Sequence, residues 1–242
     1  MPGEQYRLIF LRDLARSHGF TSPRRGGSEP RIRERDREEH SARLMQRLDE
    51  AWNASERLQH GAAVHTERHG AYIEFEGAPG FDLAIKSLEY LRSGIRLLHV
   101  RKEGEGDAER ILATVFIPYQ KRGYFLRRLR AYAEDPPTGA RPRNLKLVNS
   151  IEDIRHATLL SFWHPDEREQ IPGDVRAWLE VWLSSDRNEV SARFAGLLET
   201  MEIPSADGVL RFPERAVRLI HATRTDLERL IENSDDIAEF RP

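Results

Sequence analysis

Residues 177–201, AWLEVWLSSDRNEVSARFAGLLETM, decide the fold of this chain. The first seven residues alternate, with Leu179, Val181 and Leu183 on one side of an extended backbone, as in a half-buried strand. Apolar residues then recur at helical spacing, and Asp186 or Asn188 stands where a helix N-cap is expected. The stretch therefore predicts a strand followed directly by an amphipathic helix.

The residues after this stretch complete a familiar order of elements. Two short strands, GVLRF (208–212) and RAVRLIHA (215–222), are separated by Pro213. Thr223 or Thr225 is placed to cap the helix TDLERLIEN, and IAEFRP (237–242) is a candidate last strand. The order strand-helix-strand-strand-helix-strand predicts a ferredoxin-like unit.

The region 71–135 repeats this order but lacks the last strand. Its first strand, AYIEFEG, alternates and is expected to be half-buried, with Tyr72, Glu74 and Glu76 on its outer side. The further predicted elements are a helix at 81–94 ended by Gly94, strands at 95–103 and 110–118, and a helix at 123–135. We therefore expect an α+β fold with two ferredoxin-like units in tandem.

Four regions follow from these patterns. Residues 1–60 are expected to form an N-terminal arm and an amphipathic helix at Arg37–Leu58, because apolar residues there recur at helical spacing. Residues 61–135 form the first unit, and 177–242 form the second. Residues 136–176 are predicted to be a helical connector, with a helix over NLKLVNSIEDIRHATLLSFW (144–163).

Composition excludes several classes of protein. The absence of cysteine rules out disulfides, thiolate metal sites and a cysteine nucleophile. With 38 basic and 40 acidic residues, the net charge of -2 argues against a protein that coats nucleic acid. We find no apolar run long enough to span a membrane and no signal peptide, so a cytoplasmic location without a membrane partner is expected.

Motifs for catalysis or cofactor binding are missing. The sequence has no phosphate-binding loop, no dinucleotide fingerprint and no nucleophile elbow. His60, His65 and His69 lie close together, but a zinc site needs three or four ligands and a supporting shell, so we expect neither a metal nor a cofactor. Glu74 and Glu76 are spaced as paired carboxylates, and a solvated strand face explains them equally well.

Charge is unevenly distributed along the chain. Residues 118–146 carry a net charge of +6, and residues 225–240 carry -5. Such opposite patches steer association with charged partners. The candidate basic docking patch consists of Lys121, Arg122, Arg127, Arg128, Arg130, Arg141 and Arg143.

Several segments resemble the N-terminal, non-catalytic region of bacterial subtilisin-like serine peptidases. They are FTSPRRGG (20–27), the charged stretch before LDEAW (48–52), EFEGAPGFDLAIKSLEYLRSGIRLLHV (74–100), PRNLKLVNSIEDIRHATLLSFW (142–163), WLEVWL (178–183), LRFPERAVRLIHAT (210–223) and SDDIAEF (234–240). The family's Asp-Thr-Gly, His-Gly and Gly-Thr-Ser motifs do not occur here as a catalytic set. The resemblance therefore implies a non-catalytic chain that assists folding of, inhibits or regulates a peptidase domain in cis or in trans.

The resemblance also implies a contact surface and a second partner. Propeptides of this family resemble the second unit, and their C-terminal tail lies in the substrate cleft as an added strand. The corresponding residues here are Ile237, Ala238, Glu239, Phe240, Arg241 and Pro242. Family members are often encoded beside an AAA-type ATPase, in what look like phage-defence operons, which implies that partner.

Two alternatives remain open. The chain could be an adaptor that docks on such an ATPase, or senses a trigger, through its basic region. It could also be a ferredoxin-like nucleic-acid-binding module, with Tyr72, Phe75 and Phe116 on its strands. The third strand lacks the aromatic signature of an RNA-recognition motif, so nucleic acid is the less favoured partner.

Overall fold

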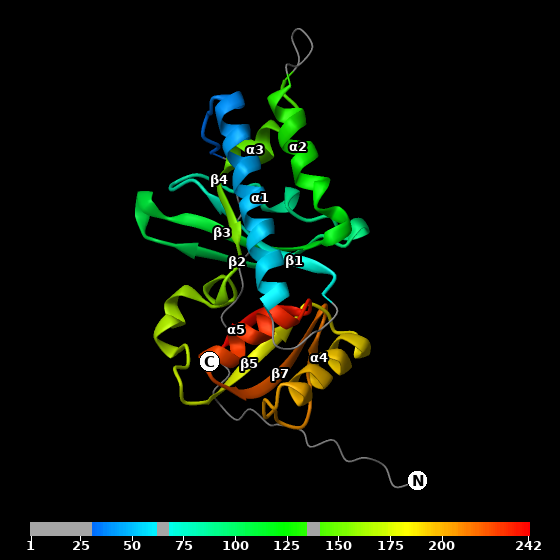
Figure 1. The fold of residues 1–242 in the computed structure, drawn as a ribbon. Coiled ribbons are helices and arrows are strands. Elements are labelled where there is room, and N and C mark those ends of the chain that lie inside the picture. Colours follow the sequence, from blue (N-terminus) through cyan, green and yellow to red (C-terminus); the bar gives the residue numbers. More distant parts are fainter. Residues whose placement is uncertain (1–30, 62–67, 135–140) are drawn as a thin grey trace. The chain divides into compact units, whose positions relative to one another are not determined.

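Two four-stranded antiparallel sheets form the framework (Figure 1). The structure is a computed structural model, and it describes residues 31–61, 68–134 and 141–242. Both sheets have the strand order of a ferredoxin-like unit, so the predicted tandem α+β fold is confirmed. The N-terminal arm predicted within 1–60 lies outside the described residues up to position 30.

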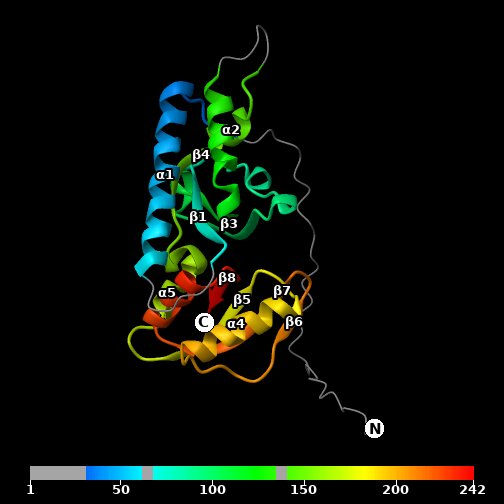
Figure 2. The same cartoon turned by 45° about the vertical axis from the view of Figure 1, so that its right-hand side comes forward.

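The second unit follows the predicted order completely. Its sheet has the order β6-β7-β5-β8, and α4 and α5 cover one face (Figure 2). Thr223 caps α5 and Asp226 bonds back to its backbone, while α4 has Arg187 at its N-cap, so the cap predicted at Asp186 or Asn188 is wrong. The elements are β5 (Ala177–Leu183), α4 (Asn188–Thr200), β6 (Leu210–Phe212), β7 (Arg215–Ala222), α5 (Arg224–Asn233) and β8 (Ile237–Arg241).

The first sheet has the order β2-β3-β1-β4 and gains a fourth strand from the predicted connector. The single helix predicted at 144–163 is wrong: only α3 (Leu145–Ser150) is α-helical, β4 (Ile151–His156) pairs with β1, and a 3₁₀ turn follows at Leu159–Phe162. The apolar spacing that suggested a helix divides between the two elements because the free edge of β1 takes β4 as its partner. The other strands are β1 (Gly70–Gly77), β2 (Arg96–Glu103) and β3 (Arg110–Pro118).

The helix predicted at 81–94 is also absent. Two short 3₁₀ turns, Ile85–Ser87 and Leu91–Ser93, replace it, and Gly94 ends the second turn in the left-handed region at φ 78°. Two helices elsewhere pack side by side against the sheet, α1 (Arg37–Gly61) and α2 (Gly123–Ala133) (Figures 1 and 2). Their apolar residues share a core with β1 and β3, so the sheet face is covered without a helix at 81–94.

Strand β1 is buried along its whole length, contrary to the half-buried strand predicted from its alternation. Ile73 and Phe75 belong to the core beneath α1 and α2. Tyr72, on the opposite side, belongs to a second core that continues through Phe162 into the second unit. The two units therefore share apolar packing, and the polar residues of β1 are enclosed between layers.

Within the described ranges, no helix combines the length and the apolar character that crossing a membrane requires.

Candidate functional site

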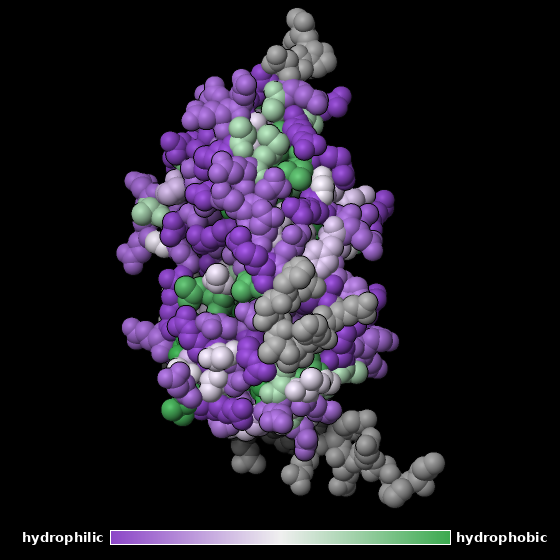
Figure 3. Space-filling model, in the orientation of Figure 1, coloured by the Kyte–Doolittle hydropathy of each residue, from purple (hydrophilic) through white to green (hydrophobic). Residues whose placement is uncertain are grey.

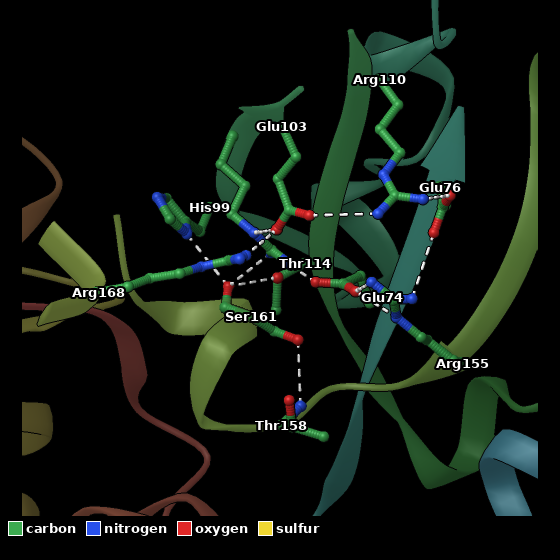
Figure 4. Close-up of polar contacts among 11 residues, drawn as sticks. Glu74, Glu76, His99, Glu103, Arg110, Thr114, Arg155, Thr158, Ser161 and Arg168 are labelled. Carbon is green, nitrogen blue, oxygen red and sulfur yellow. Dashed lines mark hydrogen bonds and ion pairs between the residues drawn. The ribbon is translucent and has the colours of Figure 1, made fainter. Parts of the chain in front are cut away.

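A charged network surrounds the buried side of the first sheet (Figure 4). The carboxylate of Glu74 is fully buried, and it lies 2.5 Å from the Arg101 guanidinium and 2.6 Å from that of Arg155. Arg101 is itself only 2% exposed along its side chain. An unpaired buried carboxylate costs roughly several kcal/mol, and here both arginines lie within ion-pair distance of Glu74.

The network continues outward through two more carboxylates. Glu76 pairs with Arg110 at 2.9 Å and with Arg155 at 3.3 Å, and Glu103 accepts from Arg101 at 3.0 Å. Burial works against ionisation of Glu103, but Arg101 and its neighbours Arg168 and Arg110 lower its pKa below the ordinary value. Glu74 and Glu76 are thus each paired with arginines from other strands of the same sheet, an arrangement that ties those strands to β1.

One backbone carbonyl organises the segment that covers this network. The Ser161 carbonyl oxygen accepts from Thr114 Oγ1 at 2.8 Å, His99 Nδ1 at 3.1 Å and Arg101 Nη1 at 3.3 Å. Since a carbonyl only accepts, Nδ1 of His99 must carry its proton. Burial lowers the pKa of His99, although the Glu239 carboxylate lies 3.8 Å from Nε2.

Polar contacts also join the two units. Arg68 Nε donates to Asp235 at 2.6 Å, and its Nη1 reaches the backbone carbonyls of Ile231 and Glu232. The Ile237 backbone N–H donates to the Tyr72 hydroxyl at 3.1 Å. The start of β1 is therefore tied to the end of α5 and the start of β8.

The environment of His156, on β4, disfavours the protonated form of its side chain. Burial is the main cause that lowers its pKa to about 4, and the Arg68 charge adds to the effect. A protonated His156 is therefore disfavoured in the folded chain at neutral pH.

The proposed peptidase-contact residues lie in β8, an edge strand paired with β5. Ile237, Ala238 and Phe240 are buried in the chain's own core, so their side chains cannot reach a partner while β8 stays in the sheet. Glu239 and Arg241 lie opposite Trp182 and Glu180, on the other face. Pro242 follows the strand and is exposed.

That other face of the second sheet is rich in exposed apolar side chains. Trp178 is 54% exposed, and Leu210, Phe212 and Leu219 are 63%, 45% and 45% exposed. We call these four residues, with the half-buried Trp182, the open sheet face. Trp182 stacks on Phe212 with ring centroids 5.3 Å apart, and the Arg241 guanidinium lies 4.3 Å from the Trp182 centroid. The alternation of residues 177–183 predicts both tryptophans on the side opposite Leu179, Val181 and Leu183. It does not identify a surface, because β6 and β7 supply the other residues.

In the structure, some residues of the basic docking patch contact other parts of the chain, and others are exposed. Arg122 pairs with Glu56 at 2.7 Å, and Arg128 lies over Tyr124 and donates to the Ser87 carbonyl. Lys121 is half-buried. The four exposed members are Arg127, Arg130, Arg141 and Arg143. The face of the first unit that carries α1 and α2 is mostly hydrophilic, as Figure 3 shows.

The other candidates receive little support. His69 is exposed, His65 lies outside the described residues, and no group of three or more potential metal ligands occurs within the described ranges. Tyr72, Phe75 and Phe116 are 1%, 0% and 5% exposed, so the strand aromatics cannot stack on bases.

Comparison with known proteins does not identify a family for this chain. No family model matches the sequence, and no curated protein does. The chain is similar to a solved structure, the small subunit of acetolactate synthase from Thermotoga maritima. The similarity covers 72% of this chain and 92% of that subunit. The identity is 13% and the TM-score 0.24, so this likeness carries no argument about function.

We predict that Arg101→Met lowers the free energy of unfolding by about 3 kcal/mol, because it leaves the Glu74 carboxylate with one of its two cations. Adding Glu74→Gln should restore at least about 1 kcal/mol of this loss. Urea unfolding measures both values. Lys102→Met on the same strand removes an exposed pair and should change stability by less than about 0.5 kcal/mol. Additive effects of the two network substitutions would contradict the coupling.

We also predict an acid-sensitive contribution from His156. Its folded pKa of about 4 lies below the ordinary 6.5, so the unfolded chain binds more protons and stability falls as pH falls. The loss between about pH 7 and about pH 5 is about 2 kcal/mol. Urea unfolding at the two pH values should show a shallower dependence for His156→Gln. His69→Gln, which alters an exposed ring, should keep the full dependence.

Proposed function

We propose that this chain is the non-catalytic, propeptide-like region of a subtilisin-like serine peptidase, and that it inhibits or regulates the peptidase domain. The observation that carries the proposal is the open sheet face on a complete ferredoxin-like unit. Contiguous exposed apolar side chains on a folded chain mark an interaction surface. The partner class comes from the resemblance of seven segments to that family.

The composition of the open sheet face suits a protein partner. Tryptophan and arginine carry much of the binding energy in protein interfaces, and Trp178 is more than half exposed. Arg241 lies over Trp182 and is paired with Glu239 at 2.8 Å, so a polar edge adjoins the aromatic centre. An apolar centre with a charged rim is the usual anatomy of such interfaces.

We further propose that only part of the tail contacts the peptidase. With β8 in the sheet, Glu239 and Arg241 present side chains on the same side as Trp182, and Pro242 follows them. We propose that this corner and the open sheet face both contact the peptidase domain. Pro242, which follows the strand, then lies toward the substrate cleft. The buried side chains of Ile237, Ala238 and Phe240 then hold the strand in place.

The test mixes this chain with a separately produced subtilisin-like catalytic domain encoded with it. We expect inhibition of peptide hydrolysis and co-elution in gel filtration. Trp178→Glu should raise the inhibition constant at least about tenfold, since it places a charge in the apolar centre. Leu91→Glu is the matched control, because Leu91 is 67% exposed on the first unit. Failure of the unaltered chain both to inhibit and to co-elute contradicts the proposal.

A second candidate is an adaptor that docks on an AAA-type ATPase. Arg127, Arg130, Arg141 and Arg143 are exposed and make no ion pair with a described carboxylate. Cations that have no carboxylate partner in the described part of the chain are available to an acidic surface, and they raise association rates.

The adaptor candidate predicts a charge-dependent capture. Reversing Arg127, Arg130 and Arg143 to Glu should reduce capture of the ATPase in a pull-down at least about tenfold, and the unaltered chain should lose capture as salt rises above about 0.1 M. Arg187→Glu, an exposed reversal on the second unit, should leave capture unchanged. Equal capture by the triple variant rejects this candidate.

A further inference from the structure

A cavity of about 530 Å³ lies where the two units meet. The first unit contributes His69, Arg96 and Phe116 to its walls, and α4 contributes Arg193, Phe194 and Leu197. Residues just before β8 close another side. Sites for small ligands commonly occupy cavities of roughly 300–1,000 Å³ at domain interfaces, so size and position both fit such a role.

The acidic groups in this cavity are already neutralised. Asp235 accepts from Arg68 Nε and from the His69 backbone N–H, both at 2.6 Å. Asp236 accepts two hydrogen bonds of 2.8 Å from the Arg193 guanidinium in a bidentate arrangement. Neither carboxylate therefore repels an incoming anion with its full charge.

Arg96 is the cation that remains. Its Nη1 donates to Ser184 Oγ at 2.8 Å, and its Nη2 donates to the Asp235 backbone oxygen at 2.9 Å. No carboxylate in the described part of the chain lies within ion-pair distance of it. Arg68 and Arg193 each pair with one aspartate, Asp235 and Asp236. The positive charge of Arg96 is therefore left in excess.

The surroundings hold the Arg96 guanidinium in place. It lies over the Phe116 ring with 4.6 Å to the centroid, and its two hydrogen bonds fix the plane. A guanidinium held before binding loses little rotamer freedom when it accepts a ligand. The apolar part of the wall comes from Phe116, Phe194 and Leu197, and polar or charged residues line the rest. An apolar surface therefore lies in the same cavity as the Arg96 cation.

We propose that this cavity binds a small organic monoanion, a carboxylate joined to an apolar body. The carboxylate pairs with Arg96, and the apolar body lies against Phe116, Phe194 and Leu197. Because the walls come from both units, the ligand adds contacts between them and raises the stability of the assembled chain. The proposal does not depend on the peptidase or adaptor role.

A set of three probes tests the proposal on the unaltered full chain. They are 3-phenylpropionate, its neutral analogue 3-phenylpropanol, and acetate, which carries the charge alone. Calorimetry measures affinity, and thermal unfolding measures stabilisation. We expect 3-phenylpropionate to bind at least about tenfold more tightly than either other probe and to raise the unfolding midpoint. Equal binding of the alcohol, or no binding of 3-phenylpropionate up to about 10 mM, overturns the proposal.

Substitutions at Arg96 locate the site. Arg96→Gln should remove the preference for the carboxylate over the alcohol, while Arg96→Lys should keep at least part of it because the charge remains. Arg187→Gln, an exposed substitution on the second unit, should keep the full preference. Circular dichroism checks folding of each variant. A folded Arg96→Gln chain that still prefers the carboxylate overturns the assignment, and the probe series remains decisive if that variant does not fold.

Discussion

The rest of the structure depends on one constraint: the carboxylate of Glu74 lies fully buried on the central strand of the first sheet. A buried charge must be paired, and here Arg101 from β2 and Arg155 from β4 supply the partners. Charge thereby holds β4 to β1 in addition to backbone pairing, and it links β1 to β2, which pairs with β3 and not with β1. The segment around Ser161 then covers the network, because its carbonyl takes three donors from the sheet beneath.

The same enclosure joins the two ferredoxin-like units. Tyr72 shares a strand with Glu74, belongs to the core of the second unit and accepts from the backbone of β8. Arg68, just before β1, forms an ion pair with Asp235, just before β8. The units therefore meet through packed and hydrogen-bonded contacts, and the cavity beside Arg96 lies within this junction. The open sheet face, on which the proposed peptidase partner is expected to dock, lies on the side of β5 that points away from the second core.

Sequence reasoning worked where local signals agreed with packing. The second unit followed its pattern because β5 alternates and the α5 cap, Thr223, stands at the right position. It failed at 81–94 and at 144–163, where apolar spacing was compatible with a helix but α1 and the edge of β1 already met the packing requirements. The alternation of β1 predicts an outer face for Glu74 and Glu76, because alternation shows which residues share a side but not what covers that side.

By itself, the sequence determined the α+β class, the order of elements along the second unit and the lack of recognised catalytic motifs, because these follow from periodicity, caps and residue type. Only the tertiary structure decided that β1 is covered on both faces, that Ile237, Ala238 and Phe240 are held inside, and that Arg122 and Arg128 are engaged within the chain. It also brought Arg96 and Arg193 to one cavity from positions 97 residues apart in the chain. Such juxtapositions depend on how two units pack, and no local pattern encodes that packing.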